Sequence, residues 1–470
     1  MAQPPRIVIL GGGFGALNVA RHLEAALRAD DRVEVTLISR ENYLLFTPML
    51  AEVAAGALSA DHAAVPLRSF LRRVAVRQGE ATGADLDQRT VTMRHSATGQ
   101  AVTVPYDHLV LATGAVTSYH HVPGATEHTL GFKTLADAAA ARGRVIDCFE
   151  QAAVESDSTA RRGLLTFVVA GGGYTGVELA AALADFLRDL RRYYPALTRE
   201  RLYLVLAHHG QRLLEELDEA DAAYTLRLLR RMGIAVRLGT GVSAVAADSV
   251  ELSPGGTLPT RTVFWTAGVA PSPFVGALPL PKDAHGAVIV DEHLAVPEHP
   301  GIWALGDCAH VPNRQGGTCG PTAQNAEQEA PVVAHNILAS LRSEPLREFD
   351  YTSRGMLASL GHQTAVGEVF GRRFSGLPAW LLWRTAYLAM LPGMDRKARV
   401  AMDWLLDLLL PPDIVNSLHP SRIAAPLAVT GSESAAPPSP VAPPAAAPGA
   451  AAPPSPATPP TAAPSDTAGP

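Results

Sequence analysis

A short glycine-rich segment near the start of the chain has the residue types and spacing that bind a pyrophosphate. It reads R-I-V-I-L-G-G-G-F-G-A over residues 6–16, and Gly11, Gly13 and Ala16 fit the pattern G-x-G-x-x-G/A. The first position turns the chain, the second lets the backbone approach phosphate, and the third lets a helix pack on a strand. The apolar residues before the motif predict a buried strand, and the helix after it begins with unsatisfied N–H groups that attract an anion. Taken alone, the motif also fits an ordinary tight turn.

The same pattern returns in the middle of the chain. The segment F-V-V-A-G-G-G-Y-T-G-V-E over residues 167–178 has Gly171, Gly173 and Gly176 at the full G-x-G-x-x-G spacing. The repetition favours dinucleotide binding over an ordinary turn at both places. Two dinucleotide sites in one chain imply that electrons pass from one dinucleotide to the other.

Composition and charge narrow the class of protein. The chain has 470 residues, which predicts two or three domains, and its net charge of -6 argues against nucleic-acid binding. Its three cysteines form no C-x-x-C pair, which fits a reducing compartment, and no metal site is predicted. The first strand begins too early for a cleavable signal segment, so we expect the protein in the cytoplasm or peripherally on the cytoplasmic face of the cell membrane.

Strands and loops around the first motif must complete its site. A second strand is expected over residues 32–39, and its end, which normally carries an acid for the ribose, has Ser39 followed by Arg40. The segment N-Y-L-L-F-T-P-M-L over residues 42–50 is either a packed loop or, in a flavoprotein, a neighbour of the flavin ring.

Three later segments end at the ligand-binding edge of an open sheet. They read L-V-L-A-T-G at 109–114, T-V-F-W-T-A-G at 262–268 and G-I-W-A-L-G-D at 301–307. Asp307 is interpreted as a ligand-binding residue, with a plain turn residue as the alternative. Helices are expected over about residues 134–153 and 320–341. The fold class is therefore α/β, with two Rossmann-like units of which the second is inserted in the first.

From residue 377 the chain changes character. Trp380, Trp383, Tyr387 and Leu391 fall at helical spacings, and basic residues follow at 396–399. Arg384 interrupts the apolar run, so no segment is long enough to span a bilayer. Aromatic residues beside basic ones favour a helix on a membrane surface, with a core helix as the alternative.

The expected domains follow from these boundaries. They are the first part of an FAD-binding domain (5–160), an NAD(P)H-binding domain (161–290), the second part of the FAD-binding domain (291–345), a C-terminal membrane-surface domain (346–420) and a disordered Pro/Ala-rich tail (421–470).

Over about residues 5–418 the chain resembles the type II NADH dehydrogenases, single-subunit flavoproteins that pass electrons from NADH to quinone without pumping protons. The most specific pieces are N-Y-L-L-F-T-P-M-L, G-G-G-Y-T-G-V-E, A-L-G-D, A-Q-N-A-E-Q and S-G-L-P-A-W-L-L-W-R. The resemblance implies FAD as cofactor, NADH or NADPH as substrate, a membrane quinone as acceptor and the bilayer surface as partner.

The resemblance also implies the site residues. For FAD they are Gly11, Gly13, Phe14, Gly15, Ala16, Ser39, Arg40, Thr47, Pro48, Ala112, Thr113, Gly114, Asp307, Ala323 and Gln324. For NAD(P)H they are Gly171, Gly173, Tyr174, Thr175, Gly176, Glu178, His208 and Gly268. The residues expected to take part in catalysis are Glu178 near the nicotinamide and Gln324 and Gln328 on the quinone side.

One departure from the family concerns the coenzyme. His208 stands where an acid often ends the second nucleotide strand, with His209 and Arg212 close by. Because the carboxylate that repels a 2′-phosphate is missing there, we expect weak discrimination between NADH and NADPH.

Two other classes of function stay open. A soluble FAD-dependent NAD(P)H reductase of the same superfamily that uses a disulfide or peroxide needs a redox cysteine near the flavin, and residues 41–56 have none. Cys308 and Cys319 are likewise too few and poorly placed for a sulfide:quinone reductase. A flavin-bound redox sensor should show negligible NADH oxidation with any quinone. The sequence leaves open which quinone is used and whether the protein forms a homodimer.

Overall fold

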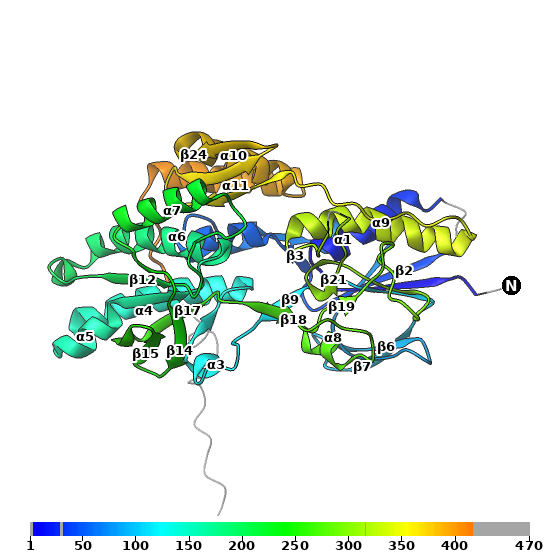
Figure 1. Cartoon of the computed structure of the whole chain (residues 1–470), viewed down its shortest axis with the longest axis horizontal. Helices are drawn as coiled ribbons and strands as arrows, with labels where there is room; N and C mark the ends of the chain where they lie inside the picture. The colour runs from blue at the N-terminus through cyan, green and yellow to red at the C-terminus, as the bar shows by residue number, and fades with distance from the viewer. Residues whose placement is uncertain (1–2, 29–31, 315, 417–470) are drawn as a thin grey trace, which may run out of the picture. The chain divides into compact units, whose positions relative to one another are not determined.

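A seven-stranded sheet forms the first Rossmann-like unit (Figure 1). The computed structural model describes residues 3–28, 32–314 and 316–416, and the tail predicted at 421–470 lies outside them. In spatial order the strands are β20 (Ile302–Ala304), β8 (His108–Leu111), β1 (Arg6–Leu10), β2 (Glu34–Ser39), β5 (Ala75–Asp85), β6 (Thr90–His95) and β7 (Ala101–Pro105). The first five are parallel, and β5, β6 and β7 form an antiparallel meander. Helices α1 (Phe14–Ala26) and α9 (Ala323–Arg342) lie together on one side of this sheet.

A five-stranded parallel sheet forms the second unit. Its strands, in spatial order, are β10 (Leu130–Gly131), β17 (Thr262–Trp265), β11 (Thr166–Ala170), β12 (Tyr203–Ala207) and β13 (Ala235–Arg237). Its helices are α4 (Leu135–Val154), α5 (Ser158–Leu164), α6 (Tyr174–Leu190) and α7 (Glu219–Arg231). An antiparallel sheet of β14 (Gly241–Val245), β15 (Ser249–Ser253) and β16 (Gly256–Pro259) belongs to the same unit.

The second unit is inserted in the first, as the repeated motif predicts. Strand β20 follows the second sheet in the chain but pairs with β8 of the first. The two connections between the units are β9 (Ala115–Thr117) and β18 (Val269–Pro271), which pair antiparallel with one another. The edge strand β10 of the second sheet comes from before residue 160, where the boundary between the units was expected.

Burial explains why the two glycine motifs follow these strands. Ile7 and Ile9 of β1 and Phe167 of β11 are fully buried, as parallel strands covered on both faces require. A capping box starts α4, where Thr134 accepts from the N–H of Asp137 and Asp137 accepts from the N–H of Thr134. Each glycine motif lies at the carboxyl edge of its sheet because it directly follows one of these buried parallel strands.

Shorter elements complete the part of the chain that the structure describes. They are β3 (Tyr43–Leu45), α2 (Leu50–Ala54), β4 (Ala64–Pro66), α3 (Ala125–His128), α8 (Pro273–Ala277), β19 (Val288–Ile289), β21 (Ala309–His310) and the 3₁₀ turns Thr47–Met49, Ala60–Ala63, Leu67–Ser69, Arg191–Tyr193, Pro195–Leu197 and Gly306–Cys308.

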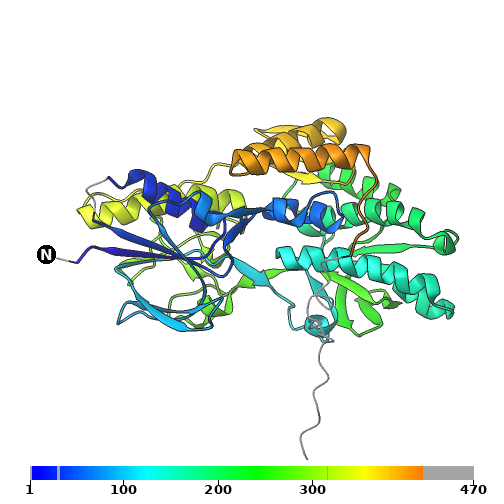
Figure 2. The ribbon, with the colours of Figure 1, turned by 180° about the vertical axis from the view of Figure 1, so that it is seen from behind.

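The C-terminal part is a three-stranded antiparallel sheet followed by two helices. Its elements are β22 (Gly355–Ser359), β23 (Ala365–Val369), β24 (Arg372–Ser375), α10 (Gly376–Met390) and α11 (Met394–Leu409). In Figure 2, α11 is the orange helix next to the yellow elements of the same part. Among the described residues, no helix is both long enough and apolar enough to cross a membrane.

The prediction that the aromatic stripe of these helices faces a membrane is wrong. Trp383 and Leu391 are fully buried and Trp380 is 7% exposed. The stripe packs inward because Phe46 of the first unit and Trp404 of α11 cover it: the Tyr387 ring lies 6.0 Å from that of Phe46. The apolar side chains that are exposed on α10 and α11 are instead Leu377, Leu381, Met390, Met394, Met402, Leu405, Leu406, Leu408 and Leu409.

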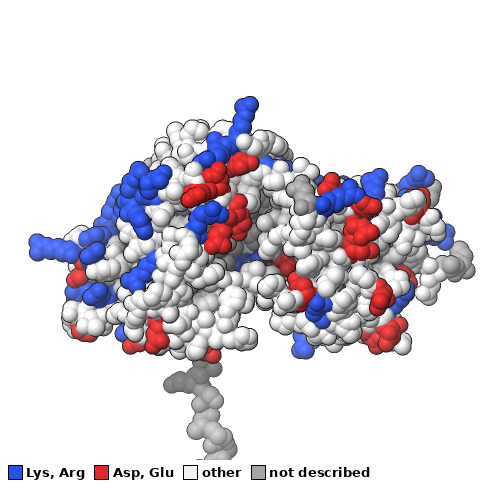
Figure 3. Space-filling view, in the orientation of Figure 1, with Lys and Arg blue, Asp and Glu red and all other residues white. Residues whose placement is uncertain are grey.

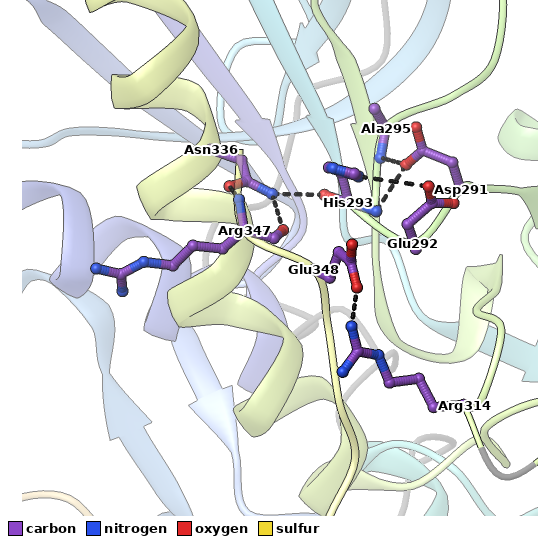
Figure 4. A network of polar contacts seen from close by, with 8 residues as sticks. All are labelled: Asp291, Glu292, His293, Ala295, Arg314, Asn336, Arg347 and Glu348. Carbon is purple, nitrogen blue, oxygen red and sulfur yellow. Dashed lines mark hydrogen bonds and ion pairs between the residues drawn. The ribbon is translucent and has the colours of Figure 1, made fainter. Parts of the chain in front are cut away.

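A buried polar network fixes α9 to the segments around it (Figure 4). The Asn336 side chain is fully buried and donates to the carbonyl oxygens of His293 and Arg347, at 2.9 and 2.8 Å. It also accepts from the N–H of Arg347 at 2.7 Å. Nearby, Asp291 accepts from two backbone N–H groups of its own turn, and Arg314 pairs with Glu348. The network ties the segment that leads into β20 to the segment that leaves α9.

Candidate functional site

In the first glycine motif, the fold itself requires a glycine at position 11 but not at position 13. Gly11 has φ +122°, and a Cβ there would come 2.1 Å from the carbonyl oxygen of Ala112. Gly13 precedes α1 with ordinary extended backbone, and a Cβ on it would meet no atom within 4 Å. Ala16 is fully buried between helix and strand. The space in front of Gly13 is therefore open. Because the N-terminus of a helix attracts anions, this space fits a pyrophosphate group.

The second motif repeats this arrangement. Gly171 has φ +114°, and a Cβ on it would lie 2.7 Å from the carbonyl oxygen of Thr266. A Cβ on Gly176 would lie 1.9 Å from the carbonyl oxygen of Gly171. A Cβ on Gly173 would meet nothing within 4 Å. In both motifs, therefore, no contact within the protein requires the glycine at the second position of the pattern, Gly13 or Gly173. A ligand that approaches the backbone there would require it.

Several predicted residues converge on the first motif. Gly11 lies against Ala112 and Thr113, and a Cβ on Gly15 would lie 3.1 Å from Leu305, just before Asp307. The Asp307 carboxylate accepts from the ammonium group of Lys133 at 3.2 Å. The residues that the sequence predicts for FAD therefore fit a dinucleotide: they form an open phosphate cradle flanked by a carboxylate whose position is fixed by a lysine.

The other residues predicted for FAD lie at the borders of this cradle. The Phe14 and Phe46 rings meet edge to face at 5.5 Å, which places the turn with Thr47 and Pro48 beside α1. Ser39 is buried, and a Cβ on the middle glycine of the motif, Gly12, would lie 2.2 Å from its hydroxyl oxygen. The remaining positions are Gly114, with φ +63°, Ala323, which starts α9, and Arg40, whose exposed side chain pairs with Glu41.

The glutamines predicted on the quinone side hold the C-terminal sheet. Gln324 donates to the carbonyl oxygen of Gly355 at 3.0 Å and accepts from the N–H of Arg354 at 2.8 Å. Gln328 donates to the carbonyl oxygen of Thr352 at 2.9 Å and accepts from its N–H at 3.2 Å. In this structure both amides therefore position the strand that follows α9.

Glu178 lies between the second unit and the C-terminal part. Its Oε1 accepts from the N–H of Ser359 at 2.9 Å. Burial raises the pKa of its carboxyl group to about 8, and the nearby charge of Glu52 adds to the rise. Burial and the neighbouring Glu178 also raise the pKa of Tyr387. Glu178 is thus an acid that still holds its proton at neutral pH.

The remaining residues predicted for NAD(P)H surround the second motif. Tyr174 and Thr175 open α6, and burial raises the pKa of the Tyr174 hydroxyl. His208 is buried, and its Nδ1 accepts from the N–H of Gly172 at 3.1 Å. Gly268 lies after β17, where a Cβ would come 2.1 Å from Nε2 of His120.

Sequence reasoning missed a charged cluster beneath the C-terminal helices. The Arg384 guanidinium lies between the rings of Trp380 and Trp404, 4.3 and 4.5 Å from their centroids. Glu52 lies 3.6 Å from this guanidinium and accepts from the indole N–H of Trp404 at 2.8 Å. Burial raises the pKa of Glu52 to about 7 despite the arginine. Sequence spacing had no signal for this cluster, because Glu52 and Trp404 come from opposite ends of the chain.

Lys133 and Glu329 were also missed. Glu329, on the buried side of α9, accepts from the N–H of Gly306 at 2.6 Å, and burial raises its pKa to about 7. It shapes the turn that presents Asp307. The sequence offered one signal for Glu329: it lies one helical turn after Asn325, on the same face of the predicted helix, and both side chains are buried.

Two nucleotide-binding units, each with an open phosphate cradle, define a dinucleotide-dependent redox protein. The family model of the pyridine nucleotide-disulphide oxidoreductases matches residues 5–330, and that of the NDH2 C-terminal domain matches residues 353–410. The type II NADH:quinone oxidoreductase NdhA of Mycobacterium tuberculosis is 33% identical, over 85% of this chain and 86% of the relative. The demethylphylloquinone reductase NdbB of Synechocystis is 32% identical, over 85% and 96%.

A solved structure shows the same fold. NDH2 from Plasmodium falciparum in complex with NADH superposes with a TM-score of 0.79 at 21% identity, over 87% of this chain and 99% of that one. The chain belongs to the pyridine nucleotide-disulphide oxidoreductase family and, within it, to the type II NADH dehydrogenases.

Proposed function

We propose that this protein is an FAD-dependent NADH:quinone oxidoreductase that works at a membrane surface without pumping protons. The observation that carries the proposal is the pair of open glycine positions, Gly13 and Gly173, in two units of one chain. Its relatives include proteins named as type II NADH:quinone oxidoreductases. The absence of proton pumping rests on the resemblance to that family.

The two cradles divide the work between the units. The first, with Gly13 and the Lys133–Asp307 pair, holds FAD through its pyrophosphate and ribityl side. When bound, FAD supplies the two-electron chemistry that connects a hydride donor to a quinone. The second, with Gly173, holds the pyrophosphate of NADH and directs the nicotinamide toward the space beside Glu178. Oε1 of Glu178 accepts from the N–H of Ser359, and burial raises the pKa of this carboxyl group to about 8.

The C-terminal part provides the membrane contact. Leucine and methionine side chains are exposed on α10 and α11, among them Leu409 at 71% and Met402 at 54%. At the start of α11 a cavity of about 360 Å³ is lined by two arginines, Arg396 and Arg399, and one acid, Asp61, together with Asn42, Tyr43, His62, Ala64 and Pro66. The excess of one basic group supports contact with an anionic head group. Figure 3 shows basic and acidic groups interspersed with much uncharged surface on one face of the molecule. We place the protein peripherally on the cytoplasmic face.

The state of the cysteines disfavours a soluble reductase that works through a disulfide or peroxide. Burial raises the pKa of the Cys148 and Cys308 thiols, and it raises that of Cys319 to about 11. A redox cysteine instead needs a lowered pKa, because the thiolate is the reactive form.

If the proposal is right, two matched variants should lose different properties, one the bound flavin and the other the oxidation of NADH. Gly13→Val fills the first cradle and should give colourless protein, whereas Gly173→Val should stay yellow but lose most NADH oxidation. Neither substitution meets protein atoms near the new Cβ, so both variants should fold. The measurements are the visible spectrum and NADH oxidation with a quinone. Fully flavin-loaded Gly13→Val protein, or wild type that carries flavin but reduces no quinone, would contradict the proposal.

A further inference from the structure

The loop after β12 returns to the second glycine motif and covers the end of the strand. The N–H of Leu214 donates to the carbonyl oxygen of Gly172 at 3.0 Å. On the other side, the N–H of Gly239 donates to the carbonyl oxygen of Gly210 at 2.9 Å. The loop is therefore held at two points, and its side chains have defined positions over the strand end.

His208, the residue at the strand end, does not offer a positive charge to a ligand. Its Nδ1 accepts from the N–H of Gly172, which leaves the ring proton on Nε2. Burial and the neighbouring His209 lower its pKa, so the ring is neutral at neutral pH. The guanidinium of Arg212, on the same loop, donates to the backbone carbonyl oxygen of Glu215 at 2.6 Å.

A carboxylate from farther along the loop occupies the strand end. Oε1 of Glu215 lies 3.5 Å from Nε2 of His208. A Cβ on Gly210 would lie 2.1 Å from the same oxygen, so the carboxylate sits directly over the turn that follows β12. The Glu215 side chain is nevertheless 56% exposed, so a ligand can reach it.

We propose that Glu215 supplies the carboxylate that His208 lacks and makes the second unit select NADH over NADPH. The end of the second strand of a Rossmann unit is where the adenosine ribose lies, and an acid there accepts from its 2′-hydroxyl. The same charge repels a 2′-phosphate. The proposal rests on the second unit being the NADH site. It replaces the expectation of weak discrimination, which counted His208, His209 and Arg212 but not Glu215.

Ligand binding tests the proposal without flavin or quinone turnover. Binding of ADP and of adenosine 2′,5′-bisphosphate to the full chain is measured by calorimetry at fixed ionic strength, for wild type, Glu215→Gln and Glu219→Gln. Wild type should prefer ADP, and Glu215→Gln should shift the ratio of the two affinities about tenfold toward the 2′-phosphate. Glu219→Gln, an exposed acid at the start of α7, is the control and should leave the ratio unchanged.

Steady-state kinetics provides the second readout. The ratio of kcat/KM for NADH over NADPH should fall about tenfold in Glu215→Gln, and Glu215→Arg should lower it further. An unchanged ratio in Glu215→Gln, or an equal shift in Glu219→Gln, would overturn the proposal. If wild type reduces no quinone yet the affinity ratio shifts as expected, the quinone reductase assignment fails and the role of Glu215 stands.

Discussion

At the scale of single residues, three acids share an unusual environment. Burial raises the pKa of Glu52 and Glu329 to about 7 and that of Glu178 to about 8. In the unfolded chain each carboxyl group would ionise with its ordinary pKa of 4.5. Between these values the folded protein binds more protons at these three groups than the unfolded chain does. Their contribution to the free energy of unfolding is therefore greatest below about pH 4.5, falls as the pH rises from there, and levels off above about pH 8.

Glu178→Gln should weaken this pH dependence. The amide keeps an acceptor oxygen for the Ser359 N–H but has no proton to lose. Wild type should lose free energy of unfolding between pH 5 and 9, and the variant should lose less, by an amount on the order of a few kcal/mol. Urea unfolding at several pH values measures the difference. Parallel curves for the two proteins would show that Glu178 does not titrate in this range.

Residues whose role is local could be predicted, and residues that act across the fold could not. Gly13 and Gly173 belong to motifs of a few residues, so spacing alone identified them. Lys133 reaches Asp307 across 174 positions of the chain, and no spacing signals such a pair. Glu215 escaped for a related reason, because it approaches His208 only when the loop folds back.

At the scale of elements, the spacing of apolar residues predicted that the C-terminal helices form, but not which of their faces is buried. The spacing of Trp380, Trp383 and Tyr387 predicted a helix, and α10 is present. Periodicity shows that one face is apolar but not what covers it. Here Phe46 covers part of the aromatic stripe, although it lies more than three hundred residues earlier in the chain. The exposed apolar surface of these helices is therefore formed by other residues, mainly leucines and methionines.

The attachment of α9 depends on Asn336. Asn336→Ala leaves the carbonyl oxygens of His293 and Arg347 and the N–H of Arg347 without their partner, so it should lower the free energy of unfolding by about 2–4 kcal/mol. Arg314→Ala removes a surface ion pair of the same network and should cost less than about 1 kcal/mol. Chemical denaturation of both variants measures the two effects. Equal losses would mean that the buried amide is not the main anchor.

At the scale of the whole molecule, membrane binding should depend on exposed leucines rather than on the tryptophans. Leu405 and Leu409 are 50% and 71% exposed, so the double variant Leu405→Ser/Leu409→Ser should fold normally and bind vesicles at least about tenfold more weakly. Flotation with phosphatidylcholine–phosphatidylglycerol vesicles measures binding. Reduction of a long-tailed quinone in those vesicles should fall with it, and that of ferricyanide should not.

Val154→Ser is the matched control for this prediction. Val154, at the end of α4, is 85% exposed, so its replacement removes apolar surface away from α10 and α11. It should leave vesicle binding unchanged. Undiminished binding by the double leucine variant would place the lipid contact elsewhere on the molecule.

The pairing of β9 with β18 has a mechanical consequence. Both passages of the backbone between the nucleotide-binding units run through one antiparallel ribbon, with Ala115 opposite Pro271 and Thr117 opposite Val269. A single linker would allow one unit to rotate freely relative to the other. Two strands joined by backbone hydrogen bonds resist twisting and permit mainly bending. We therefore expect the ribbon to limit rotation of one unit about the other, so that the two glycine motifs keep a nearly constant separation.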